Sequence, residues 1–170
     1  MRTITTRKVA QAIVLTALAV ALSPFFVPIG ITKVYPAQHM VNVLGAVLLG
    51  PWYATAVALA AGVIRNILGT GTIFAFPGGM IGAFLAGLAF RYTRNIYFAA
   101  LGEVVGTGLI AATVSALLVG PAFLGKTMPL LTFIIGFSAS TIAGSIIGVL
   151  GVLILRRAGF LVTAAQARET

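Results

Sequence analysis

Long apolar segments, separated by short stretches of proline, glycine and charged residues, make up most of this chain. A membrane-spanning helix needs about 20 predominantly apolar residues, and several of the segments approach that length. Proline and glycine end helices, and they divide the segments at Pro24, Gly50-Pro51, Gly69-Thr70-Gly71 and Gly120-Pro121. The pattern predicts six helices, over residues 8–23, 39–49, 51–68, 77–91, 96–119 and 130–155.

Composition favours a membrane location for these helices. Of the 170 residues, 60% are hydrophobic and only 8% are charged. At about 20 residues per crossing, the chain has room for a handful of spans and little else, so no soluble catalytic domain fits. We therefore expect residues 1–170 to form one membrane domain, an all-α integral membrane protein with six transmembrane helices in the lipid bilayer.

The charged residues indicate how these helices are oriented. The formal net charge is +9, but the cations lie singly or in pairs at the ends of apolar segments. That placement is typical of membrane orientation signals, so we expect no binding of nucleic acid. With six spans and both termini in the cytoplasm, eight cations lie inside, and only Lys33 and Lys126 lie outside. The longer loops, over residues 24–38, 69–76 and 120–129, would then share the external face.

Two charged residues, Arg65 and Glu103, interrupt apolar segments. A charge at the bilayer centre costs about 2.5 to 3.5 kcal/mol on insertion scales, so such a residue indicates a functional site. The alternatives without a function are that Arg65 snorkels to the lipid headgroups and that Glu103 is a protonated, structural group. From the helical rise the two residues lie at different depths. Glu103 could therefore pair with Arg65, accept a hydrogen bond from Thr107 one turn outward, or form the floor of an external cavity.

Other polar and aromatic residues gather at the same predicted external end. His39 and Asn42 are three residues apart and hence share a helix face. Aromatic residues near this end, Phe123 and Phe133 among them, could stack on a planar ring, although interfacial aromatic belts are commonplace. Ligand sites combine an apolar or aromatic lining with a few polar groups, which fits a small, neutral, ring-containing molecule. The predicted substrate site consists of Tyr35, Gln38, His39, Asn42, Arg65, Asn66, Phe74, Phe76, Glu103 and Thr107.

Motifs of enzymes and metal sites are missing from the sequence. The chain has one histidine, two acidic residues and no cysteine, which is too little for metal-assisted hydrolysis or a Ser-His-Asp triad. It also lacks the glycine-rich loop that cradles nucleotide phosphates. We therefore expect no enzymatic activity, no cofactor and no metal site. Active uptake of a molecule would require partner subunits or an ion gradient.

Three segments of the sequence are distinctive in combination. They run from Lys33-Val-Tyr-Pro-Ala-Gln-His through Gly50-Pro-Trp-Tyr53, from Arg65-Asn-Ile-Leu-Gly-Thr-Gly through Phe76-Pro-Gly-Gly-Met-Ile-Gly82, and over Leu101-Gly-Glu-Val-Val-Gly-Thr-Gly108. Together they resemble the ThiW family, the small substrate-binding S components of energy-coupling factor (ECF) transporters. The resemblance covers roughly residues 7–157.

The resemblance to ThiW implies both a ligand and partners. The ligand would be hydroxyethylthiazole, the thiazole precursor of thiamine, bound near the outer face of a prokaryotic cell membrane. The partners would be a transmembrane coupling subunit and two cytoplasmic ATPases. Small residues on the first helix commonly make that association, because they let helices approach closely. The matching positions here are Ala17 and Ala21 and, more weakly, Ala12 and Thr16.

Other functions stay open at this point. The ligand could instead be the pyrimidine precursor of thiamine or thiamine itself, although the cationic thiamine would need an acidic residue near the outer face. Glu103 is the only acidic residue within the apolar segments, and it lies deep. From another class, the protein could be a small membrane enzyme or a scaffold without a ligand.

Overall fold

The computed structural model describes residues 6–29 and 32–160. Arg2 and Arg168, which we counted among the inside cations, lie outside the described residues. The described residues form α1 (Thr6–Ala21), β1 (Val27–Ile29), β2 (Thr32–Val34), α2 (Pro36–Leu49), α3 (Pro51–Ile67), α4 (Ala75–Thr93), α5 (Ile96–Val105), η1 (Gly106–Ala111), α6 (Ala112–Val114), η2 (Ser115–Val119), α7 (Gly120–Leu124) and α8 (Leu130–Arg157).

The segments α5 to α7 follow one another without a break, so residues 96–124 form a single helix. Within it, η1 and η2 are π-helical. The helical fold predicted from the apolar pattern is thus confirmed for the described residues. We expected Gly120-Pro121 to end this helix, but it continues to Leu124. It ends at Gly125, whose φ of 62° is a left-handed conformation that glycine adopts without strain.

The first loop differs from its prediction. We expected no regular structure over residues 24–38, but β1 and β2 pair there as an antiparallel ribbon, with Val27 opposite Val34. The following helix, α2, begins at Pro36 rather than at His39. Proline is well suited to the first helical position, because its missing N–H has no partner there in any case. The fold is therefore helical with one short β-ribbon.

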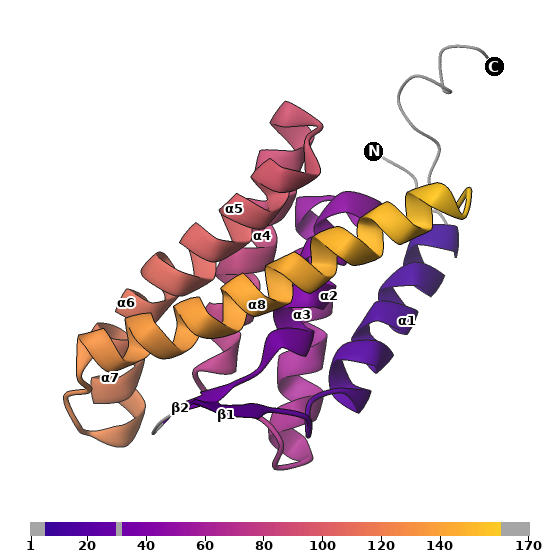
Figure 1. Cartoon of the computed structure of the whole chain (residues 1–170). Coiled ribbons are helices and arrows are strands. Elements are labelled where there is room, and N and C mark those ends of the chain that lie inside the picture. The colour runs from indigo at the N-terminus through magenta and orange to yellow at the C-terminus, as the bar shows by residue number, and fades with distance from the viewer. Residues whose placement is uncertain (1–5, 30–31, 161–170) are drawn as a thin grey trace.

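The helices pack around α2, which contacts α1, α3, α4, α5 and α8. In Figure 1, the β-ribbon, the C-terminal end of α3 and the short helix α7 lie at one end of the molecule, in the lower part of the view. The beginning of α1, the end of α8 and the α4–α5 turn lie at the opposite end. The three longer loops thus share one end, and we call this the ribbon end.

Close contacts between helix backbones depend on glycine. A Cβ atom on Gly87 of α4 would lie 2.7 Å from the backbone nitrogen of Pro51 at the start of α3. A Cβ atom on Gly102 of α5 would lie 2.7 Å from the carbonyl oxygen of Leu85. Both distances are too short for a carbon atom, so the absence of a side chain is what allows these helices to touch.

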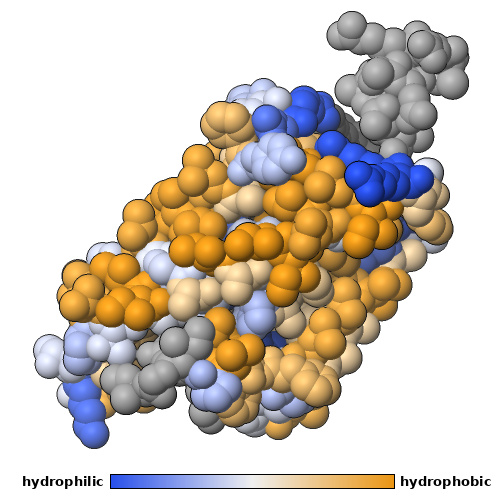
Figure 2. All heavy atoms as spheres, viewed as in Figure 1, coloured by the Kyte–Doolittle hydropathy of each residue, from blue (hydrophilic) through white to orange (hydrophobic). Residues whose placement is uncertain are grey.

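The outer surface suits a lipid environment. Among the described residues, the helices Ile96–Leu124 and Leu130–Arg157 are long and apolar enough to cross a membrane. Large apolar side chains are exposed on many helices, including Ile13, Trp52 and Leu131. Figure 2 shows apolar residues covering most of the visible face, with hydrophilic residues gathered near its two ends. Exposed apolar surface of this extent is rare on soluble monomers and typical of contact with lipid.

Candidate functional site

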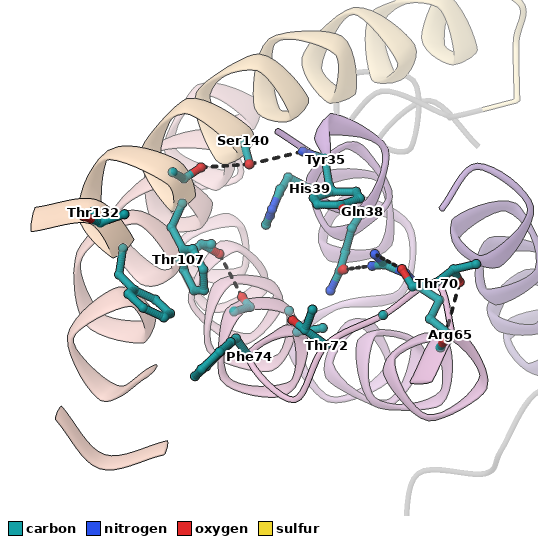
Figure 3. Close-up of a pocket in the computed structure, with 17 residues that line it drawn as sticks. Tyr35, Gln38, His39, Arg65, Thr70, Thr72, Phe74, Thr107, Thr132 and Ser140 are labelled. Carbon is teal, nitrogen blue, oxygen red and sulfur yellow. Dashed lines mark hydrogen bonds between the residues drawn. The ribbon is translucent and has the colours of Figure 1, made fainter. Parts of the chain in front are cut away.

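A cavity of about 320 Å³ lies among α2, α3, α4, η1 and α8, toward the ribbon end of the molecule. Figure 3 shows polar and aromatic side chains from these helices around one central space. The lining residues are Tyr35, Gln38, His39, Arg65, Thr70, Gly71, Thr72, Phe74, Ala75, Gly78, Gly79, Thr107, Thr132, Phe133, Gly136, Phe137 and Ser140.

Arg65 is held inside the protein at the last turn of α3, where only 4% of its surface is exposed. The backbone N–H groups of Thr70 and Gly71 each donate to the carbonyl oxygen of Arg65 at 2.9 Å, so the chain folds back over this residue. The guanidinium donates to Gln38 Oε1 and lies over the ring of Tyr35, 5.7 Å from its centroid. Arg65 therefore faces the cavity and does not snorkel to the surface.

Glu103 is fully buried and lies directly behind the cavity wall. Its Oε1 atom is 2.7 Å from His39 Nδ1, 3.0 Å from Asn42 Nδ2 and 3.0 Å from Thr107 Oγ1. Of the three alternatives that the sequence left open for Glu103, the hydrogen bond with Thr107 is therefore the one that the structure contains. Within the described residues Glu103 makes no ion pair with Arg65, because the two side chains bind different partners. Glu103 supports the residues that line the cavity without lining it itself.

Two glycines of α4 make room for these polar side chains. A Cβ atom on Gly79 would overlap Gln38 Nε2. A Cβ atom on Gly82 would overlap Thr107 Oγ1 and would lie 2.6 Å from Glu103 Oε2. In a lipid environment small residues let helices come close enough for hydrogen bonds between them. Gly79 and Gly82 therefore bring α4 into direct contact with the polar groups of the site.

The predicted site residues fall into three groups by position. Asn42 and Glu103 lie behind the cavity and hold its wall, since Asn42 also donates to the carbonyl oxygen of Gly79 at 3.1 Å. Asn66 and Phe76 lie outside it. The residues that line the cavity directly are Tyr35, Gln38, His39, Arg65, Phe74 and Thr107.

Asn66 and Phe76, which we predicted to belong to the site, have other contacts in the structure. Asn66 Nδ2 donates to the carbonyl oxygens of Gly62 at 2.8 Å and Thr72 at 3.2 Å, and it stabilises the chain after α3. Adjacent positions on a helix point about 100° apart, so the inward direction of Arg65 turns Asn66 away. The ring of Phe76 packs against Gly62 of α3.

The sequence indicated one wall of the cavity only through Phe133, which was named as a possible stacking residue but not included in the predicted site. Phe133, Gly136, Phe137 and Ser140 of α8 line this wall at the spacing of a single helix face. Phe133 meets Phe74 edge to face with ring centroids 4.8 Å apart. Ser140 Oγ accepts a hydrogen bond from the backbone N–H of Tyr35, at 3.2 Å. Gly136 and Ser140 form a stripe of small residues that indicates helix packing as readily as a site.

The predicted docking residues of α1 do not share one free face. Ala17 and Ala21 are exposed, but Ala12 and Thr16 are only partly so. Ala12 packs against the apolar core. The hydroxyl of Thr16 donates a hydrogen bond to the carbonyl oxygen of Ala12 at 2.9 Å. The exposed face of α1 therefore contains Ala17 and Ala21 together with larger residues such as Val14.

The cavity combines an apolar surface with a few hydrogen-bonding groups, a lining that suits a small molecule. Three aromatic rings of phenylalanine supply an apolar surface, while Arg65, Gln38 and His39 supply hydrogen bonds. No carboxylate lines the cavity in the described part of the chain. In the same part, no cluster of three histidine or acidic side chains could hold a metal ion.

Comparison with known proteins identifies the family of this chain. The family model described as Thiamine-precursor transporter protein (ThiW) matches residues 9–158. None of the curated proteins compared with the chain matches it. The family match includes every residue that lines the cavity. The chain therefore belongs to the ThiW family of thiamine-precursor transporter proteins, as the resemblance of its three distinctive segments predicted.

Proposed function

We propose that this protein is the substrate-binding S component of an ECF-type transporter and that its cavity binds hydroxyethylthiazole, the thiazole precursor of thiamine. Binding would occur at the external face of a prokaryotic cell membrane, and uptake would be driven by ATP through partner subunits. The observation that carries the proposal is the cavity, in which buried hydrogen-bonding groups and aromatic rings face one space.

The size and lining of the cavity support a small aromatic ligand. Small-molecule sites range from about 300 to 1,000 Å³. This cavity, at about 320 Å³, lies at the lower end of that range. The edge-to-face pair of Phe74 and Phe133 continues to Phe137, 5.6 Å from Phe133 between centroids. Such rings form a favourable surface for a planar heterocycle.

Charge favours the thiazole over thiamine itself. Thiamine carries a fixed positive charge, and the described lining contains the guanidinium of Arg65 but no carboxylate to balance a cationic ligand. Glu103 is separated from the cavity by His39 and Thr107, and its Oε1 atom is already engaged in hydrogen bonds with His39, Asn42 and Thr107. A neutral ligand avoids repulsion from Arg65. The pyrimidine precursor has more polar groups and fits the aromatic lining less well.

The distribution of cations supports six spans with both termini in the cytoplasm. Lys8, Arg91, Arg94, Arg156 and Arg157 belong to helix ends away from the ribbon end. Cytoplasmic loops carry an excess of Lys and Arg, so this end would face the cytoplasm and the cavity would face outside.

Orientation can be tested with single cysteines, because the chain contains none of its own. Lys126 and Arg94 are both exposed and lie in turns at opposite ends. A membrane-impermeant maleimide applied to intact cells should label Lys126→Cys, whereas Arg94→Cys should react only after the membrane is opened. The reverse labelling pattern would show that the orientation is wrong.

Association with a coupling subunit would use the exposed small residues of α1. Ala17 and Ala21 are one helical turn apart and would allow a partner helix to approach closely. Ala17→Leu should reduce co-purification with the coupling subunit and the two ATPases. Ala56→Leu, which adds the same bulk at an exposed position of α3, is the matched control. Equal co-purification of the two variants would argue against docking through α1.

The ligand is tested most directly by thermal shift and calorimetry on purified protein. Hydroxyethylthiazole should raise the melting temperature in detergent, and thiamine and the pyrimidine precursor should do so less or not at all. Mass spectrometry of protein purified from its source provides a second readout, since a tightly bound thiazole should co-purify. A response to thiamine alone, or no response to any of the three compounds, would refute the proposed ligand.

A further inference from the structure

His39 has one ring edge toward the protein and the other toward the cavity. It is 7% exposed and lines the cavity, with Nδ1 2.7 Å from Glu103 Oε1. Within the described residues no protein group forms a hydrogen bond with Nε2. Figure 3 shows the ring of His39 directed into the central space. The free nitrogen is therefore available to a ligand.

The partners of Glu103 determine which nitrogen of His39 carries a hydrogen. Asn42 Nδ2 can only donate and Thr107 Oγ1 donates as well, so Oε1 accepts from both, and we infer that it is a carboxylate or carbonyl oxygen without a hydrogen of its own. An acceptor 2.7 Å from His39 Nδ1 requires a hydrogen on Nδ1. This holds for an ionised carboxylate and for a carboxyl group protonated on Oε2, whereas a hydrogen on Oε1 would give the opposite tautomer, which the spectrum described below distinguishes. In a neutral imidazole the other nitrogen, Nε2, then has a lone pair and accepts hydrogen bonds.

Gln38 provides a hydrogen-bond donor in the same cavity, whereas His39 provides an acceptor. Its Oε1 atom accepts a hydrogen bond from Arg65, which fixes the orientation of the side-chain amide. The Nε2 group is consequently a donor, and it has no hydrogen-bond partner among the described residues although Gln38 is only 6% exposed. A buried donor without a partner is costly, and a ligand atom with a lone pair would satisfy it.

We propose that Glu103 is a positioning residue that holds His39 as the neutral Nδ1–H tautomer, so that His39 Nε2 accepts a hydrogen bond from the hydroxyl of the ligand while Gln38 Nε2 donates to its ring nitrogen. This inference rests on the proposed function and specifies how the site selects within its substrate class. A site built to pair with a hydroxyl rejects analogues that lack the hydrogen, because its own buried group is left unpaired.

The tautomer can be observed without any ligand. The chain contains a single histidine, so a long-range ¹H–¹⁵N spectrum of histidine-labelled protein carrying a non-histidine purification tag reports on His39 alone. We expect a protonated Nδ1 and an unprotonated Nε2. A ring protonated on Nε2, either alone or together with Nδ1, would overturn the assignment.

Ligand analogues test whether the site prefers a ligand that has a hydroxyl group. We expect the wild-type protein to bind hydroxyethylthiazole at least about tenfold more tightly than its methyl ether, which keeps the oxygen but lacks the hydrogen. Equal binding of the alcohol and the ether would overturn the inference and leave the proposed function standing. Failure of both compounds to bind would instead overturn the proposed function and, with it, the ligand contact, while the spectrum would still decide the tautomer.

Variants separate the role of His39 from that of Glu103. Asparagine places an amide nitrogen near the position of Nδ1, so His39→Asn keeps a donor for Glu103 but removes Nε2. This variant should stay folded and lose the preference for the alcohol over the ether. Glu103→Gln keeps an acceptor oxygen for His39 and should retain the preference, whereas Glu103→Met should lose it. A wild-type preference in His39→Asn would overturn the proposal even if Glu103→Met fails to fold.

Discussion

A single methyl group on α4 should weaken binding strongly while leaving the fold nearly intact. In Gly79→Ala the new Cβ would overlap Gln38 Nε2, but it would lie 3.5 Å from Gln38 Cδ and 3.4 Å from Ala58 Cβ, which are ordinary contacts. Only the terminal amide of Gln38 must therefore move. Rotation of the amide swings Oε1 away from Arg65, and a complete flip would set Nε2 against the donors of the guanidinium.

The cost of Gly79→Ala follows from the one hydrogen bond that is lost. A hydrogen bond to a charged group contributes about 1.5 to 3 kcal/mol. Alanine is about 0.5 to 1 kcal/mol better than glycine inside a helix, which offsets part of that loss. The net destabilisation of about 0.5 to 2.5 kcal/mol corresponds to a Tm lower by about 1 to 10 °C. In contrast, Arg65 and Gln38 would no longer be positioned for the ligand, and Kd should rise about 10- to 150-fold.

Two measurements on one preparation decide the Gly79→Ala prediction. Thermal unfolding in detergent gives the change in stability, and isothermal titration with hydroxyethylthiazole gives the change in affinity. Gly45→Ala is the matched control, since its added methyl group would meet no atom closer than Ala54 Cβ at 3.4 Å. If Gly79→Ala binds within twofold of the wild type, the Arg65–Gln38 pair does not contact the ligand and the reasoning fails.

Three further substitutions test other parts of the structure. Arg65→Met removes the guanidinium but keeps much of its bulk, and it should raise Kd about tenfold or more in titration calorimetry; unchanged affinity would exclude Arg65 from the site. Phe74→Ala removes the partner of the Phe133 ring and should weaken binding of the alcohol and of its methyl ether alike, which competition assays can measure. Gly87→Ala places a Cβ 2.7 Å from the backbone nitrogen of Pro51 and should destabilise the protein by about 1 to 3 kcal/mol in thermal unfolding, with no direct effect on the ligand.

Sequence patterns predicted which residues belong to this site better than they predicted which residues form hydrogen bonds with each other. Arg65 and Glu103 stand out because charge in an apolar segment is costly, and both belong to the polar interior. Their partners could not be derived. Glu103 bonds to His39 across 64 residues, and Arg65 bonds to Gln38 across 27 residues. Pairing at such separations depends on how the helices rotate against each other, and that rotation is set by contacts of small residues that look alike along the chain.

The wall formed by α8 shows a second limit of sequence patterns. Phe133 and Phe137 face the cavity, but in a helix that is apolar on all sides no face is distinguished by its hydrophobicity. The β-ribbon was missed for a different reason. Each strand has only three residues and Pro28 lies in the first, so no alternating pattern is long enough to indicate it.

The π-helical segment η1 marks the place where its helix can absorb a change of one residue in length. A π-helical turn accommodates an additional residue, and such turns occur often at functional sites. Removal of one residue from 106–111 would restore regular α-helical geometry there and leave the helix beyond it facing as before, whereas removal of one residue from a regular α-helix rotates everything beyond it by about 100°. We therefore expect a one-residue deletion within 106–111 to disturb the packing of the later half of this helix less than a one-residue deletion in the middle of the α-helical α4.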